Sequence, residues 1–156
     1  MSKNSKATQG GKNKRKGSAF ERDVSAKLSL WIYGDKSILR RSPSSGAEHQ
    51  YGQGADVSLF QPGYELFKYF VEVKCGYKED LFNARKQILE WYSIAKEKNK
   101  LEYPIWIIWK ILNRGIILCT DKRFNENIPE LYTLNNLFVY DFKYLLSLNY
   151  NDCIKE

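Results

Sequence analysis

Three charged residues in this chain have the types and the spacing that catalysis requires. Asp56 lies near the start of an alternating apolar segment, 55–60, and Glu72 and Lys74 lie in a second one, 67–75. Side chains at i and i+2 of a strand share a face, so Glu72 and Lys74 should project to the same side, roughly 7 Å apart at Cα. If the strand that begins near Asp56 lies next to the strand of Glu72 and Lys74, two carboxylates and one ammonium group come close together. Such a group can bind Mg²⁺ and position a water molecule, the minimum requirement for metal-assisted cleavage of a phosphodiester.

Each of these residues also has a purely structural interpretation. Asp56 could cap a turn at the start of its strand, and Glu72 and Lys74 could form an ion pair on a solvated sheet edge. Phe70 shares the face of that pair, however, which is less common on a fully solvated face. Gly54 and two earlier glycines precede Asp56 and let the backbone pass close to a phosphate or a metal. We therefore favour a functional role for the three charged residues together.

Glu21 has two interpretations that the residues leave open. It is the fourth residue of a Ser-x-x-Glu pattern that begins at Ser18, and Phe20, Val24 and Leu28 then recur at helical spacing. Glu21 could therefore return a hydrogen bond to the N-cap of a helix. A carboxylate one turn into that helix could instead reach a metal from above the sheet.

Two further groups of candidates are polar residues near the predicted site. Ser44 and Ser45 lie in a predicted loop over residues 42–54, which is long for a compact domain, and long loops are often functional. They could be solvated, or their hydroxyls could contact phosphate together with the arginines that precede the loop. Gln87 lies beside the apolar stripe of a predicted helix, where it would usually be solvated but could contact a DNA backbone.

Length and composition favour one intracellular domain. The chain has 156 residues, no apolar run near the ~18 that span a bilayer, and a polar, basic N-terminus unlike a secretory signal. Its three cysteines are widely spaced and it has one histidine, so we expect a reducing, cytoplasmic compartment and no zinc site.

Positive charge is concentrated at the N-terminus. Residues 1–17 hold six of the 25 basic residues and none of the 18 acidic ones, so nearly all of the net charge of +7 comes from them. The segment is polar throughout, so we expect residues 1–17 to be a disordered arm that binds a polyanion such as DNA, or merely a solubilising tail, with residues 18–156 forming the main domain. The candidate DNA contacts are Lys12, Lys14, Arg15, Lys16, Arg22, Arg40, Arg41 and Gln87.

Hydrophobic periodicity predicts an α/β fold: a single domain with a mixed central β-sheet flanked by helices. Strands 55–60 and 67–75 are expected to pair as a hairpin, and the strand 104–112, apolar on both faces, should lie inside the sheet with Trp106 and Trp109 in the core. The other expected elements are a helix from Ser18 to the turn at Gly34, a strand at 37–40, a helix at 79–98, strands at 116–120 and 137–140, and a short helix ending at Leu148.

With these residues in place, the chain resembles the PD-(D/E)xK nuclease superfamily, and more closely the archaeal-type Holliday junction resolvases, which also occur in phages. The resemblance covers roughly residues 14–92. It rests on four pieces in the same order and with similar spacing: Lys-Gly-Ser-Ala-Phe-Glu-Arg at 16–22, Arg-Ser-Pro-Ser-Ser-Gly at 41–46, Asp56, and Val-Glu-Val-Lys at 71–74.

The resemblance implies a restriction-endonuclease-like core and a metal-dependent endodeoxyribonuclease. By that pattern Glu21 is an active-site acid and a further metal ligand, Asp56 and Glu72 bind the metal, and Lys74 orients the attacking water. Ser44 and Ser45 would lie in a catalytic loop. We expect the backbone carbonyl of Val73 to complete the protein ligands, with Mg²⁺ as cofactor and Mn²⁺ able to substitute. Enzymes of this kind work as homodimers that resolve four-way junctions by paired nicks in recombination and repair.

Some features depart from the pattern. Ala55 stands where the superfamily often has proline, and thirty-five residues separate Glu21 from Asp56. A nuclease of the same fold that acts on other branched, duplex or single-stranded DNA therefore remains an alternative. A second alternative, of a different class, is a DNA-binding module without catalysis, although the presence of Glu21, Asp56, Glu72 and Lys74 together argues against it.

Overall fold

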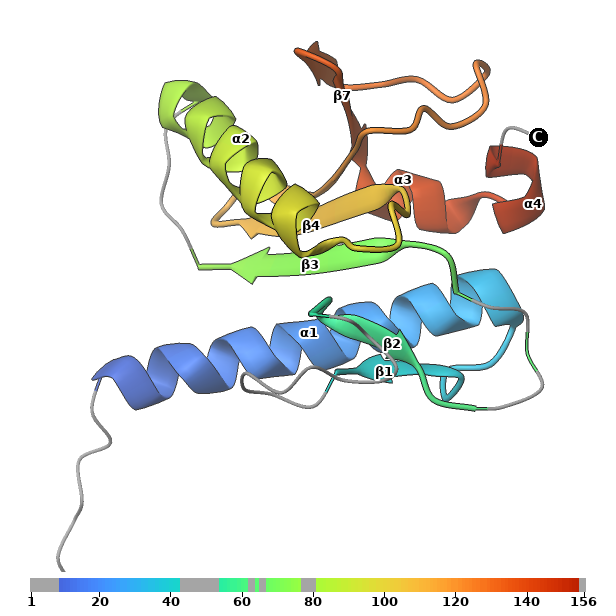
Figure 1. The fold of residues 1–156 in the computed structure, drawn as a ribbon, viewed down its shortest axis with the longest axis horizontal. Helices are drawn as coiled ribbons and strands as arrows, with labels where there is room; N and C mark the ends of the chain where they lie inside the picture. The colour runs from blue at the N-terminus through green and yellow to red at the C-terminus, as the bar shows by residue number, and fades with distance from the viewer. Residues whose placement is uncertain (1–8, 43–53, 62–63, 65–66, 77–80, 155–156) are drawn as a thin grey trace, which may run out of the picture.

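A computed structural model describes residues 9–42, 54–61, 64, 67–76 and 81–154. Within these ranges the chain forms four helices and seven strands (Figure 1). They are α1 (Gln9–Tyr33), β1 (Leu39–Arg41), β2 (Val57–Leu59), β3 (Phe70–Cys75), α2 (Leu81–Lys98), β4 (Ile105–Ile111), β5 (Gly115–Thr120), β6 (Tyr132–Leu134), β7 (Leu137–Asp141), α3 (Phe142–Ser147) and α4 (Tyr150–Cys153).

The predicted α/β architecture with a mixed sheet is confirmed. The main sheet has five strands in the order β3-β4-β5-β7-β6. β3 runs parallel to β4, and the other neighbours are antiparallel. β4 lies inside the sheet as predicted, and its Trp106 and Trp109 are buried in the core.

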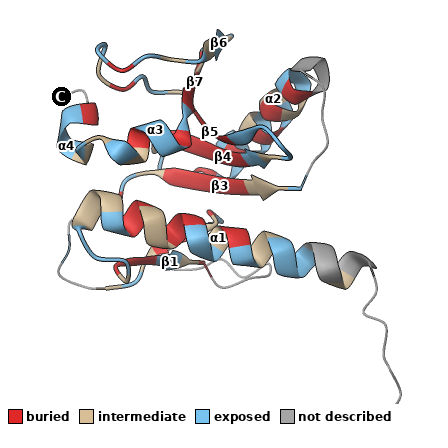
Figure 2. Cartoon of the chain, turned by 180° about the vertical axis from the view of Figure 1, so that it is seen from behind, coloured by how far each residue is buried: buried red, intermediate tan, exposed pale blue. Residues whose placement is uncertain are grey.

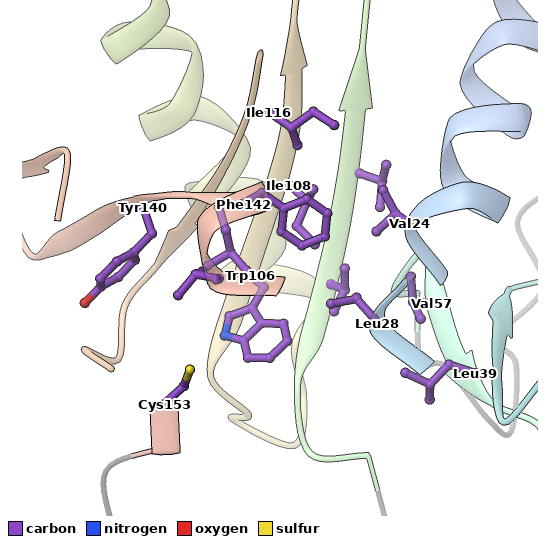
Figure 3. Packing of buried hydrophobic residues seen from close by; sticks show 14 of the residues in the cluster. Val24, Leu28, Leu39, Val57, Trp106, Ile108, Ile116, Tyr140, Phe142 and Cys153 are labelled. Carbon is purple, nitrogen blue, oxygen red and sulfur yellow. The ribbon is translucent and has the colours of Figure 1, made fainter. Parts of the chain in front are cut away.

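Helices cover both faces of this sheet. On one face the buried stripe of α2, with Ala84, Ile88, Trp91 and Ala95, packs against Phe70 and the odd-numbered residues of β4. On the other face the side chains of α1, α3 and α4 join one cluster with β3, β4 and β5, part of which is shown in Figure 3. The opposite faces predicted for the alternating residues of β3 are therefore confirmed, because Val71 and Val73 enter the second cluster while Phe70 enters the first.

The predicted hairpin between segments 55–60 and 67–75 is wrong. β2 pairs antiparallel with β1 in a separate two-stranded sheet, with Arg40 opposite Ser58. β3 instead takes β4 as its ladder partner. The alternation of apolar residues indicates which face of a strand is buried but does not identify its neighbour.

The predicted start of the first helix at Ser18 is also wrong. α1 begins at Gln9, so residues 9–17 are helical rather than a disordered arm, and Ser18 lies inside the helix, where it cannot act as an N-cap. The remainder of the predicted arm, residues 1–8, lies outside the described residues. Lys, Arg and Gln are good helix formers, and each glycine costs only about 1 kcal/mol, so the helix fixed by the buried face of Phe20, Val24 and Leu28 extends toward the N-terminus.

α1 lies between the sheet and the β1–β2 pair, which it contacts on different sides (Figure 1). Leu39 of β1 and Val57 of β2 belong to the same apolar cluster as Val24 and Leu28 of the helix. The helix ends where predicted, at Gly34, whose φ of +74° favours glycine. The N-terminal turns of α1 extend beyond the sheet and are largely exposed where burial is described (Figure 2).

Two leucines of α1 test this packing. Leu28 is fully buried against the sheet, whereas Leu30 on the opposite side of the helix is 47% exposed. We expect Leu28→Ala to lower the free energy of unfolding by roughly 2–5 kcal/mol, because it removes buried methyl groups and leaves a cavity. Leu30→Ala should change it by no more than about 0.5 kcal/mol. Urea denaturation measures both, and equal losses in the two variants would contradict the described orientation of α1.

Candidate active site

Asp56 is attached to the edge of the main sheet by its backbone and its side chain. Its N–H donates to the carbonyl of Val71 at 2.8 Å, and its Oδ2 accepts from the N–H of Val73 at 2.7 Å. Gly54, with φ at +90°, provides the backbone conformation of the turn just before it. Because β3 is the terminal strand of its sheet, these bonds satisfy part of an otherwise open edge and hold the Asp56 carboxylate beside the Glu72–Lys74 segment.

Glu72 is a nearly buried carboxylate held between two lysines. It is 4% exposed. Its Oε2 lies 3.2 Å from Nζ of Lys74, and its Oε1 lies 3.7 Å from Nζ of Lys98. The Lys74 ammonium group also lies 5.6 Å from the ring centroid of Trp91 on α2. Glu72 and Lys74 therefore share a face of β3, as their spacing predicts, and that face is covered by α2.

The environment of Asp56 disfavours its charged form. Burial raises the pKa of Asp56 to about 7, and the nearby carboxylates of Glu72 and Glu21 act in the same direction. The N–H of Val73 and the ammonium group of Lys74 lower the pKa but do not offset the burial. A carboxyl with so perturbed a pKa beside a second buried carboxylate is typical of a functional site rather than a surface ion pair.

Glu21 lies near this pair but its carboxylate is engaged elsewhere. Its Oε2 accepts from Nε of Arg41 on β1, and both side chains are partly buried. The capping-box interpretation is wrong, because Ser18 is inside α1. Glu21 is close enough to raise the pKa of Asp56. Yet in the described part of the chain no three His, Cys, Asp or Glu side chains form a group that could hold a metal ion, so the role of Glu21 as a metal ligand stays a prediction.

The oxygen atoms at the edge of β3 fit a hard divalent cation. Oε1 of Glu72 is buried and accepts no hydrogen bond from the described residues. The N–H and C=O of one strand residue point to the same side, so the carbonyl of Val73 faces the edge at which Asp56 lies. Mg²⁺ is bound in proteins by one or two carboxylates and keeps several waters, so Asp56, Glu72 and this carbonyl are a sufficient set of protein ligands. A cation there would also offset the repulsion between the two carboxylates.

The sequence prediction missed Lys98. Lys98 lies in the last turn of α2, where a lysine is expected because it complements the helix dipole. Its position in the sequence therefore gave no reason to assign it to the site. The structure places it near Glu72, with Gly54 packed beside its aliphatic stem. The one signal that could have identified Lys98 is the length of α2. A helix of eighteen residues that follows β3 is long enough to run back along the strand and place its last turn beside Glu72.

The other predicted residues are placed as follows. Ser44 and Ser45 lie outside the described residues. Lys12 lies in α1, and its side chain is also outside the description. Exposed side chains are those of Lys14, Arg15, Lys16, Arg22 and Arg40, whereas Arg41 and Gln87 are half-buried. Arg22 lies on α1, Arg40 and Arg41 lie on β1, and Gln87 lies on α2. None of the helices in the described ranges combines the length and apolar character needed to cross a bilayer.

The raised pKa of Asp56 gives a pH-dependent prediction. In the folded protein without metal, this carboxyl keeps its proton up to about pH 7, whereas the unfolded chain releases it near pH 3.8. Its contribution to stability is therefore complete below about pH 4 and is lost as the pH rises through 7. An asparagine side chain at this position mimics the protonated form, so Asp56→Asn in EDTA should raise the melting temperature increasingly from pH 5 to pH 8, by roughly 2–4 °C for each kcal/mol.

Mg²⁺ provides the second part of this experiment. Added at pH 8, it should stabilise the wild-type protein and narrow its difference from the variant, because it binds the charged carboxylate. A melting-temperature difference that is the same at pH 5 and pH 8 in EDTA would contradict the assigned environment of Asp56.

The comparisons with known proteins identify the family of this chain. A family model described as "phage putative PDDEXK endonuclease" matches residues 12–144, which include Glu21, Asp56, Glu72 and Lys74. No curated protein and no solved structure matches the chain. The resemblance to the PD-(D/E)xK superfamily is thus confirmed, although the resemblance to junction resolvases in particular is not part of that match. The match covers most of the chain, which therefore belongs to this phage family of PD-(D/E)xK endonucleases and is a nuclease.

Proposed function

We propose that this nuclease is a Mg²⁺-dependent, structure-selective DNA endonuclease that resolves four-way junctions by paired phosphodiester nicks. The observation that carries the proposal is the convergence of the Asp56 and Glu72 carboxylates at the edge of β3, with Lys74 3.2 Å from Glu72. PD-(D/E)xK nucleases generally use divalent metals, and the Glu72 carboxylate is close enough to Asp56 to raise the pKa of Asp56.

The residues at the edge of β3 divide the chemistry between them. Asp56, Glu72 and the carbonyl of Val73 would hold Mg²⁺, with Mn²⁺ as a substitute, and Glu21 could join them after leaving Arg41. A cation held there would polarise the scissile phosphate and lower the pKa of an attacking water. The Asp56–Val73 hydrogen bond fixes one carboxylate against the strand, so the ligand geometry is set before substrate arrives.

Lys74 and Lys98 would provide the positive charge for the transition state. Lys74 is partly buried beside Glu72 and Trp91, so it is positioned to hold the attacking water and to offset negative charge that develops on the phosphate. Lys98 is half-exposed and close to the second oxygen of Glu72, so it can contact a phosphate while remaining near the site. Ser44 and Ser45, which lie outside the described residues, would contribute from the loop predicted for residues 42–54.

DNA binding would depend on the basic residues around α1. The exposed N-terminal turns carry Lys14, Arg15 and Lys16, and Arg22 lies further along the same helix. Such contacts to phosphates bind without sequence preference and weaken as salt rises. Four-way-junction selectivity is proposed from the resemblance to junction resolvases, and a homodimer would supply the two active sites that paired nicks require.

Alanine variants test the catalytic assignment. We expect Asp56→Ala and Glu72→Ala each to reduce cleavage of a labelled DNA junction in Mg²⁺ by at least roughly 10³-fold, since each removes a metal ligand. Junction binding in Ca²⁺ should be retained, because removal of a carboxylate does not weaken attraction to phosphates. Glu126→Ala, which alters an exposed carboxylate outside the site, is the matched control and should cut like the wild type. Undiminished cutting by either site variant would refute the assignment.

A substrate panel tests the proposed selectivity. The wild-type protein should cut a four-way junction at least roughly tenfold faster than linear duplex or single-stranded DNA of the same sequence, and should nick two opposing strands. Denaturing gels that resolve each labelled strand measure this. Equal rates on linear duplex would replace junction resolution by a broader nuclease activity. Binding without cutting in both Mg²⁺ and Mn²⁺ would instead indicate a non-catalytic DNA-binding module.

A further inference from the structure

An open hollow of about 340 Å³ lies between α1 and β1, next to the proposed active site. Arg22, Ser25 and Ala26 line it from the helix, and Lys36 and residues 39–42 line it from the segment that follows. Its size is at the lower end of the range for small-molecule pockets, and it is not enclosed, so it suits one group of a larger ligand better than a whole small molecule.

The charge around this hollow is strongly unbalanced. Four of its lining residues are cations, namely Arg22, Lys36, Arg40 and Arg41, and none of the described lining residues is a carboxylate. Arg41 is neutralised by Glu21, and Arg40 lies 5.7 Å from the ring centroid of Phe60. The acid next to Lys36 in sequence, Asp35, accepts hydrogen bonds from the N–H and hydroxyl of Ser37. Cations gathered in a concave surface attract an anion more strongly than the same charges spread over a convex one.

We infer that this hollow binds one phosphodiester of the DNA backbone, a different one from the phosphate that is cut. The inference rests on the proposed DNA-cleaving function. Arg22 and Lys36 supply charge from two sides, and Ala26 and Leu39 give an apolar floor against which a sugar can pack. The ligand class is therefore a polyanionic strand rather than a free nucleotide, for which the hollow has no aromatic lining residue among those described.

The position of the hollow would let a phosphate bound there position the DNA strand at the active site. Ser42, which lines the hollow, donates its N–H to the carbonyl of Asp56 at 2.8 Å, and Arg41, which also lines it, binds Glu21. A phosphate held by Arg22 and Lys36 thus lies beside the active site rather than on a remote surface. It would fix the register of the strand, so that a neighbouring phosphodiester is presented to Asp56 and Glu72.

The test is the salt dependence of DNA binding by the double variant Arg22→Ala/Lys36→Ala. Arg41 is left unchanged because it holds Glu21. Binding of a labelled junction is measured in Ca²⁺ by fluorescence anisotropy, without cleavage, over a series of salt concentrations. We expect affinity at low salt to fall roughly tenfold and the slope of log K against log salt to become shallower by about 0.9, the value for one phosphate on duplex DNA.

Two control variants sharpen the result. Lys122→Ala/Lys143→Ala removes two exposed cations outside the hollow and should leave the slope unchanged. Arg22→Lys/Lys36→Arg keeps both charges and should restore most of the affinity. Both positions in the hollow are exposed, so far-UV circular dichroism and the melting temperature should be unchanged in every variant.

The outcomes separate this inference from the proposed function. Equal losses in the hollow variant and the Lys122/Lys143 control would overturn it, because only overall charge would matter. A loss confined to DNA with a 5′-phosphate end would also overturn it in favour of a terminal phosphate site. If the wild-type protein binds and cuts DNA while the hollow variant binds equally well, only this inference fails. If the wild-type protein binds no DNA, the proposed function fails with it.

Discussion

The arrangement of the site depends on how Asp56 is attached to the free edge of β3. Two hydrogen bonds, to the carbonyl of Val71 and from the N–H of Val73, join the β1–β2 pair to the five-stranded sheet without a regular strand ladder. They satisfy backbone groups at an edge strand and place one carboxylate beside another. The same attachment causes the burial that raises the pKa of Asp56 to about 7. The same hydrogen bonds therefore hold the β1–β2 pair on the sheet and set the environment of the Asp56 carboxyl.

This attachment places the Asp56 carboxylate beside the buried Glu72 carboxylate, an arrangement that is unfavourable for folding alone. Glu72 is nearly buried, and although Lys74 and Lys98 lie within 3.2 and 3.7 Å of its two oxygens, its Oε1 has no hydrogen-bond partner among the described residues. Replacing a buried ion pair with well-packed apolar residues is often neutral or stabilising. The presence of Glu72 is therefore not explained by a contribution to the stability of the fold. A divalent cation between Asp56 and Glu72 would remove both the repulsion and the unsatisfied oxygen. The proposed cation would thus account for both destabilising features of the site.

The shared face of Glu72 and Lys74 could be predicted from the sequence, whereas the connections around them could not. The alternation through Phe70, Glu72 and Lys74 predicted their shared face, because the two-residue period of a strand depends only on local geometry. The predicted partner of β3 was wrong, because hydrophobic periodicity indicates which side chains are buried and not which strands are neighbours. The predicted start of α1 was wrong, because a basic segment can continue a helix that is already fixed by packing. Lys98 was missed because its proximity to Glu72 arises only when α2 folds back over the sheet. β6, only three residues long, gave no distinct pattern.

The position of α1 connects the separate parts of the proposed nuclease. One side of the helix packs on the sheet through Val24 and Leu28, and the other side meets β1, so Glu21 and Arg22 are held between the active site and the basic hollow. The N-terminal turns of the same helix extend past the sheet and carry exposed cations (Figure 1). A DNA strand that follows these charges would pass from the end of α1, across the hollow, to the edge of β3. Because α1 carries the exposed cations, forms one wall of the hollow and packs on the sheet whose edge holds Asp56 and Glu72, this proposed path follows regular elements rather than loops.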